Sequence, residues 1–247
     1  MRDRLQKSSR SGREQLARLS PTLHMGWRQV LFANWPVDPS VVRPHVPDSL
    51  SVDTHAGDAW LSVVPYTNVD VRPTWIPAGW GVALPELNLR TYVTHDGHDG
   101  VYFFSLDAEG LLGVLGARLF HHLPYFYASI SIDTDGDRVR FESERRHPGA
   151  RPARFAGTYH PTGDQLAADA GSRAAFLTER YRYYTQVPSG TLRYARVDHE
   201  PWQLYEANVH LGENTLFEAN GFAHPETDPI HYYSPGVRTI ATRNRPL

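Results

Sequence analysis

The chain has no cysteine and a single lysine among its 247 residues. Without cysteine there is no disulfide bond, no thiol nucleophile and no thiolate ligand for a metal. Lys7 is therefore the one side chain that could form a Schiff base with a carbonyl compound. It lies in a charged N-terminal segment, where we expect no dry surroundings to lower the pKa of its ammonium group.

Long apolar runs and the common nucleotide and hydrolase motifs are also missing. No apolar run approaches the roughly 20 residues of a membrane-spanning helix, and the first residues carry no apolar signal-peptide core. The net charge of −2 gives no basic excess for nucleic acids. GxSxG, P-loop, HExxH and pre-helical GxGxxG motifs are absent. We expect a cytoplasmic protein without cofactor, metal, nucleic-acid or membrane partner that acts on a small molecule.

Two segments differ in composition. Residues 1–20 form a basic tail in which Ser11 and Glu14 have the spacing of a helix capping box. The tail is an arm for nucleic acid or membrane, a solvated tail, or a segment docked on a neighbouring subunit. Residues 21–247 are predicted to form one domain, because hydrophobic residues make up 40% of the chain and no linker divides it.

The patterns within residues 21–247 predict an α+β fold that is mostly antiparallel sheet with a few short helices. We expect a strand at 24–34 and a short helix after Asp38. Hairpins are predicted at 87–107 and 125–145, around Asp-Gly turns. Further helices are predicted at 111–120 and from Ser172 to about residue 184. Trp75 and Trp80, in a loop at 72–81, either cover a pocket or pack on the sheet surface.

Charged and amide side chains stand inside otherwise apolar strand sequence between residues 85 and 128. Glu86, Asn88 and Arg90 share one face of a strand by its period of two. Asp107 follows in the next strand and Arg118 lies further on. Because an unpaired buried charge is costly, these residues must either pair or face a cavity. We interpret them as the lining of a pocket.

Each candidate has two interpretations. Glu86 is a general acid or base with a raised pKa, or it forms a salt bridge with Arg90 or Arg118. Arg118 binds an oxyanion of the substrate, or it holds the sheet together through Glu86 or Asp107. His121 and His122 point to opposite sides of an extended chain, so at most one reaches the pocket. Asn88, Arg90, Asp107 and His121 are assigned to substrate binding.

Five motifs in order, ELNLRTYV, VYFFSLDA, ARLFHHLPYFYA, FLTERY and HEPWQL, resemble the YqjF-like family of bacterial proteins. The resemblance covers about residues 27–237, and the family looks related to the acetoacetate decarboxylase-like superfamily. It implies a curved antiparallel sheet closed into a cone-like barrel around a central pocket. It also implies a pocket carboxylate at Glu86, and a homo-oligomer.

The superfamily's Arg-Glu-x-x-x-x-Pro-Lys-Lys segment, whose first lysine forms the Schiff base, is altered here. Arg118 and Pro124 keep their spacing, but Tyr125 and Phe126 take the two lysine places. The resemblance therefore implies the scaffold without the imine chemistry. Tyr125 offers a phenol that donates to a developing oxyanion, or it is a core tyrosine. Glu86, Arg118, Tyr125 and His122 are the predicted catalytic residues.

Two functions remain open at this stage. One is a lyase, hydratase or isomerase that uses acid–base chemistry on a carbonyl or carboxylate compound. The other is a non-catalytic barrel that binds or senses a small apolar or aromatic ligand, as the 12% aromatic content favours.

Overall fold

A computed structural model describes residues 21–110 and 122–247 of the chain. The basic tail, the helix expected at 111–120, Arg118 and His121 lie outside the described residues. The strands are β1 (Pro21–Val37), β2 (Ser51–Val52), β3 (Ala59–Pro73), β4 (Val82–His95), β5 (His98–Ala108), β6 (Tyr125–Asp135), β7 (Arg138–Arg145), β8 (Arg154–Leu166), β9 (Arg182–Gln186), β10 (Leu192–His199), β11 (Leu204–Asn214), β12 (Ile230–Thr242) and β13 (Arg245–Pro246). The helices are α2 (Pro39–Val42), the 3-10 turn η1 (Arg43–His45), α4 (Arg173–Thr178) and α5 (Leu216–Ala219).

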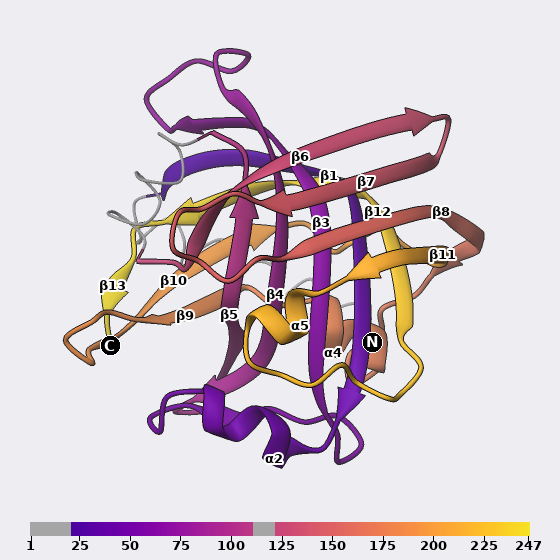
Figure 1. Cartoon of the computed structure of the whole chain (residues 1–247). Coiled ribbons are helices and arrows are strands. Elements are labelled where there is room, and N and C mark those ends of the chain that lie inside the picture. The colour runs from indigo at the N-terminus through magenta and orange to yellow at the C-terminus, as the bar shows by residue number, and fades with distance from the viewer. Residues whose placement is uncertain (1–20, 111–121) are drawn as a thin grey trace.

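All of these strands belong to one 13-stranded sheet (Figure 1). Its pairs are antiparallel except β5–β6 and β5–β9, which are parallel. Extra pairings of β4 with β5 and of β10 with β12 make the hydrogen bonding run in closed circuits. One circuit consists of β1, β3, β4, β5, β9, β10 and β12. The second consists of β1, β3, β4, β5, β6, β7, β8, β11 and β12, so the two circuits share β1, β3, β4, β5 and β12. The predicted class, mostly antiparallel sheet with short helices, is confirmed.

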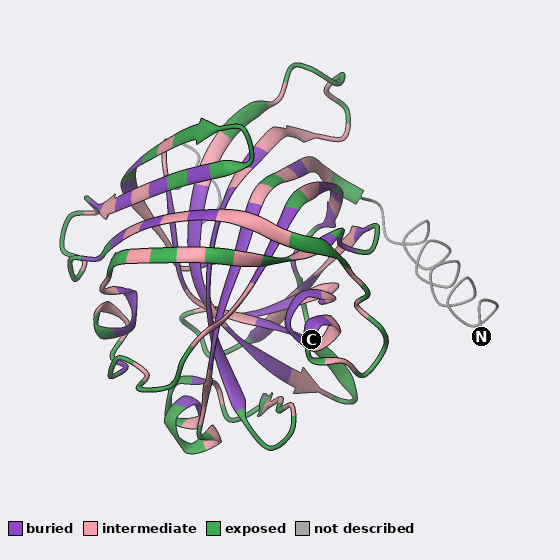
Figure 2. Ribbon diagram, turned by 90° about the vertical axis from the view of Figure 1, so that its right-hand side faces the viewer, coloured by how far each residue is buried: buried purple, intermediate pink, exposed green. Residues whose placement is uncertain are grey.

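Residues 30–35 of β1, 59–66 of β3 and 86–89 of β4 are buried without a break, so these parts of the sheet are covered on both faces; Figure 2 shows long buried stretches through the middle of the molecule. On β1, Val30 and Phe32 pack into one apolar cluster, whereas Leu31 and Trp35 pack into another. The second cluster also contains Phe217 of α5, whose ring meets that of Trp35 edge to face at 5.1 Å. Alternation along a strand thus sends neighbouring residues into two separate cores. The cluster with Val30 and Phe32 surrounds the cavity described below.

Local turn chemistry explains both predicted hairpins. Asp96 and Gly97 connect β4 to β5 with φ angles of 48° and 74°, so both adopt the left-handed conformation that a two-residue hairpin turn needs. The β6–β7 turn uses Gly136 at φ 59°. At the start of α2, the Asp38 carboxylate accepts a hydrogen bond from the Ser40 backbone at 2.8 Å, which caps the helix as expected.

The predicted helix from Ser172 to about residue 184 is wrong in its second half. Ser172 does cap α4, but the helix ends at Thr178, and residues 182–186 form strand β9. The run Arg-Tyr-Tyr-Thr-Gln is rich in residues that favour strands, and its pairing with β5 and β10 decides the outcome.

The loop after β3 holds its two tryptophans away from the cavity. Trp75 and Trp80 are 79% and 81% exposed, and neither lines the cavity. The base of the loop is fixed by Asp70, whose carboxylate accepts hydrogen bonds from the backbone of Gly79 and Gly81 at 3.2 Å each. As placed in this structure, the loop does not cover the pocket.

Candidate functional site

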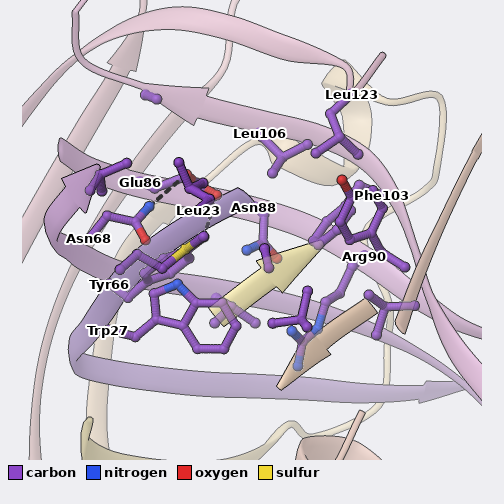
Figure 3. Close-up of a pocket in the computed structure, with 18 of the residues that line it drawn as sticks. Leu23, Trp27, Tyr66, Asn68, Glu86, Asn88, Arg90, Phe103, Leu106 and Leu123 are labelled. Atoms are coloured by element: carbon purple, nitrogen blue, oxygen red, sulfur yellow. Dashed lines mark hydrogen bonds between the residues drawn. The ribbon is translucent and has the colours of Figure 1, made fainter. Parts of the chain in front are cut away.

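A cavity of about 790 Å³ lies inside the circuit of β1, β3, β4, β5, β9, β10 and β12. This volume is within the range of small-molecule sites in proteins. Its walls are largely apolar, with Phe32, Phe103, Leu106 and Leu123 among the lining residues (Figure 3). Glu86, Asn88 and Arg90 all line it from β4, which confirms that the three share one face of the strand.

Glu86 is 3% exposed and its carboxylate is held by three donors. The hydroxyl of Tyr66 donates to Oε1. Asn68 Nδ2 donates to Oε2 at 2.9 Å, and the hydroxyl of Tyr125 donates to the same oxygen at 3.1 Å. No ion pair to Glu86 is present among the described residues, so the alternative of a salt bridge to Arg90 is wrong.

Burial raises the pKa of Glu86 from 4.5 to about 7, while the hydrogen bonds from Tyr66, Tyr125 and Asn68 act in the opposite direction. A carboxyl group with this pKa exists in both protonation states near neutral pH, which suits a general acid or base. Burial also raises the pKa values of Tyr66 and Tyr125 well above the usual value for a phenol. Both phenols therefore stay protonated and act as hydrogen-bond donors.

His122 is a predicted catalytic residue that lines the cavity. Its backbone has a φ of 53°, and its carbonyl oxygen accepts a hydrogen bond from the Thr185 hydroxyl at 2.5 Å.

Asp107, predicted to bind substrate, does not line the cavity and is not placed to bind a substrate there. It forms a buried ion pair with Arg145 on the opposite face of β5, since Leu106 and Ala108 on either side of it take the cavity face.

The described residues contain no group of three or more histidine, aspartate or glutamate side chains that could hold a metal ion. Within the same part of the chain, no helix has the length and apolar character needed to cross a membrane.

Residues 24–238 match the DUF2071 family, which is described as "Uncharacterized conserved protein". The chain belongs to this family. It is 44% identical over 209 residues to the protein named "Uncharacterized protein YqjF" of Bacillus subtilis (strain 168), with 84% of this chain and 85% of that protein covered. The resemblance found in the sequence motifs is thereby confirmed.

Solved structures with the same fold come from enzymes. An acetoacetate decarboxylase-like enzyme from Sphingomonas wittichii RW1 aligns with a TM-score of 0.62 at 18% identity, covering 93% of this chain and 95% of that one. The acetoacetate decarboxylase of Legionella pneumophila gives 0.61 at 10% identity, with 92% and 87% covered. The enduracididine biosynthesis enzyme MppR, in complex with pyruvate, gives 0.61 at 11% identity, with 92% and 90% covered. These likenesses establish the acetoacetate decarboxylase-like fold.

In this DUF2071 chain, the lining residues that the sequence analysis did not single out include Tyr66, Asn68, Trp27 and His199. Asn68 carries the same signal that identified Asn88, an amide inside a strand-forming run. Tyr66 shares its face of β3, so the period of two also points to it. Trp27 and His199 are brought together only by tertiary packing, with their rings 5.8 Å apart.

Glu86 should make the folded protein less stable as pH rises. The pKa of its carboxyl is about 7 in the folded chain against 4.5 ordinarily, so the folded state binds more protons than the unfolded state between these values. The free energy of unfolding then falls across this window, by roughly 3 kcal/mol at most from Glu86 alone. In Glu86→Gln this contribution is removed. We expect the stability of the wild type relative to the variant, measured by urea unfolding, to decrease between about pH 5 and about pH 8. A constant difference would mean that Glu86 titrates normally.

Proposed function

We propose that this protein is an enzyme that transfers a proton on a small carbonyl or carboxylate compound, as a lyase, hydratase or isomerase does. One observation carries the proposal: a carboxyl group with a pKa of about 7 is held by three donors in the wall of a largely apolar cavity. The enzyme-bearing fold agrees with it. Glu86 moves the proton, and the Tyr125 phenol supports the developing charge on a substrate oxygen.

The hydrogen bonds around Glu86 suit this role. Tyr66 and Asn68, both on β3, fix the carboxylate without supplying a charge that would pin it in the ionised form. Tyr125 lines the cavity and contacts Glu86, so one phenol can touch both the substrate and the proton-transferring group. Loss of the Tyr125 hydroxyl would leave Glu86 with two donors.

The test is exchange of carbon-bound protons with solvent. We would incubate the protein in D₂O with a panel of 2-hydroxy, 2-oxo and 3-oxo carboxylates, and follow deuterium incorporation by mass spectrometry. A proton-transferring enzyme labels at least one class of compound at the carbon it deprotonates. Binding without any labelling, across the panel, would instead favour the second candidate, a pocket that binds or senses a small ligand. The mainly apolar lining of the cavity supports that candidate.

We expect no imine between this protein and a ketone. Residues 21–247 contain no lysine, and the place of the superfamily's Schiff-base lysine is taken by Tyr125, whose oxygen cannot form a carbon–nitrogen bond. After incubation with acetoacetate or pyruvate and reduction with borohydride, the intact mass should show no stoichiometric adduct. An adduct on Lys7, with loss of activity in Lys7→Ala, would contradict this.

A further inference from the structure

The loop between β3 and β4, residues 74–81, carries two tryptophan side chains into solvent. Trp75 and Trp80 are 79% and 81% exposed, and Val82 at the start of β4 is 54% exposed. Figure 1 and Figure 2 show the loop projecting beyond the rest of the sheet. Residues 73–85 contain no charged side chain. Large apolar side chains gathered on a surface in this way mark a site of contact with another apolar surface.

Hydrogen bonds within the loop hold it in this projecting shape. The carboxylate of Asp70 accepts from the loop backbone, and Nε of Arg72 lies 3.0 and 3.1 Å from its two oxygens. Nη1 of Arg72 donates to the carbonyl of Ile76, inside the loop, at 2.7 Å. The two charges at the base of the loop thus neutralise each other. A loop fixed at its base presents its tryptophans to a partner rather than folding them onto its own pocket.

The basic tail joins the described fold directly beside this loop. The backbone N–H of Thr74 donates to the Thr22 carbonyl at 3.2 Å, and the Thr74 hydroxyl donates to the Pro21 carbonyl at 3.4 Å. Residues 1–20, which precede this contact, contain six basic and two acidic side chains. An excess of four positive charges is therefore attached to the fold next to the exposed tryptophans.

The cavity around Glu86 reaches the surface at the same place. Thr22 and Leu23 line it from the first residues of β1, and Val71 and Val82 line it from the two sides of the loop. Thr22 and Val82 are themselves exposed. The loop and the point where the tail joins the fold therefore lie where the cavity wall meets solvent.

Exposed tryptophan beside an excess of basic residues suits the surface of an anionic bilayer. Indole rings favour the headgroup region of a membrane, and each lysine or arginine close to an anionic surface adds to the attraction. A nucleic acid would bind the basic side chains, but an uncharged loop offers nothing to its phosphates. A protein surface would accept the tryptophans, whereas the basic excess beside them favours a partner with continuous negative charge.

We propose that this face, made of the β3–β4 loop and the adjoining basic tail, binds the surface of a bilayer that contains anionic phospholipids. Trp75 and Trp80 enter the headgroup region, and the basic side chains of residues 1–20 supply electrostatic attraction. The expectation of no membrane partner rested on the lack of a long apolar run in the sequence. Attachment to a membrane surface needs no such run.

Co-sedimentation with lipid vesicles tests the proposal. We would compare vesicles of phosphatidylcholine alone with vesicles of phosphatidylcholine and phosphatidylglycerol in equal parts, over a range of salt concentrations. The full chain should bind the anionic vesicles more tightly by at least about 10-fold, and added salt should reduce this preference. Brominated lipids in the same vesicles should quench part of the tryptophan fluorescence, because the exposed indoles enter the bilayer.

The double variant Trp75→Ser with Trp80→Ser assigns the binding to the loop. It should bind anionic vesicles about 10-fold more weakly or worse, and quenching by brominated lipid should disappear. Because both side chains are exposed, the melting temperature should stay that of the wild type. Val41→Ser is the matched control, since Val41 is 42% exposed on α2, at the opposite end of the molecule from the loop in Figure 1. It should bind as the wild type does.

A charge reversal in the tail assigns the preference for anionic lipid. Arg13→Glu should weaken binding to anionic vesicles by about 10-fold and leave binding to neutral vesicles unchanged. Arg151→Glu is the matched control, because Arg151 is exposed between β7 and β8 and the net charge changes equally. Glu86→Gln should bind both kinds of vesicle as the wild type does, since the proposal does not depend on the proposed function.

The proposal is overturned if the full chain does not bind anionic vesicles, or binds neutral vesicles equally well. Unchanged vesicle binding by the tryptophan double variant overturns it too. Tighter binding to RNA or duplex DNA than to the vesicles, at the same salt concentration, would assign the tail to nucleic acid instead. Lipid-free dimers that the tryptophan double variant cannot form would assign the loop to a second copy of this chain. Either of these two results also overturns the proposal.

Discussion

Glu86→Gln is expected to lower the rate of deuterium exchange into a substrate by about 100- to 10,000-fold, which is the usual contribution of a general acid or base. The variant removes the titrating group and keeps its volume. Gln Oε1 can still accept from Tyr66, and Asn68 can turn its amide, because its own Oδ1 has no partner among the described residues. We therefore expect a melting temperature close to that of the wild type, measured alongside the exchange rate.

The pH dependence of the exchange rate shows whether Glu86 acts as a base or is only a polar neighbour of the substrate. If ionised Glu86 removes the proton, the wild-type rate rises with pH around the pKa of about 7 and the variant shows no such rise. Glu109→Gln is the matched control, since Glu109 lines the same cavity but its carboxylate accepts from the Ile130 backbone at 3.0 Å. An unfolded Glu86→Gln protein, or one that exchanges at the wild-type rate, would show that Glu86 is structural.

Arg145→Met should lower the free energy of unfolding by about 3–5 kcal/mol, the cost of leaving one member of a buried ion pair alone. The side chains of Asp107 and Arg145 are 1% and 2% exposed, and they form two hydrogen bonds of 2.7 and 3.1 Å. The guanidinium also lies 4.1 Å from the ring centre of Phe126, which adds a cation–π contact. Urea unfolding at neutral pH measures the loss.

Arg140, on the same strand as Arg145, provides the control for this loss of stability. Arg140 on β7 pairs with Glu142, but its side chain is 66% exposed, so Arg140→Met should cost less than about 1 kcal/mol. Burial raises the pKa of Asp107 and Arg145 holds it down, so Arg145→Met should be most harmful at high pH, where the abandoned carboxyl is charged. Replacing both partners, as Asp107→Leu with Arg145→Met, should recover much of the loss. If the two single arginine variants were equally stable, the buried pair would not hold these strands together.

The sequence predicted what depends on local pattern. The Asp-Gly turns marked two hairpins, Ser172 marked the start of a helix, and the period of two placed Glu86, Asn88 and Arg90 on one face. What it could not supply depends on partners distant in the chain. The sequence does not show which residues of β5 face the cavity, so it could not show that Asp107 points away from it. The ion-pair partner of Asp107, Arg145, lies 38 residues further along the chain.

Pairing between strands distant in the chain also explains why the helix begun at Ser172 ends early and why Tyr66 was not predicted as a site residue. Large side chains at 176, 180, 183 and 184 have the spacing of one helix face, but the pairing of residues 182–186 with β5 and β10 makes this segment a strand. Tyr66 becomes part of the site because β3 pairs with β4 so that it lies opposite Glu86. Arg118 and His121 lie outside the described residues, so their assigned roles stay predictions.

Because β4 is buried on both faces, substitutions along it fall into two kinds with different effects. Leu87, Leu89 and Val93 fix the register of the strand from one core, whereas Glu86, Asn88 and Arg90 face the cavity from the other side. A shift by one residue would exchange the two sets, so the apolar positions keep the polar side chains facing the cavity. Mutation can therefore explore new ligands at the even-numbered positions while the odd-numbered ones keep the chain folded. Libraries randomised at Asn88 and Arg90 alone should yield a higher proportion of folded variants than libraries randomised at two adjacent positions of the strand.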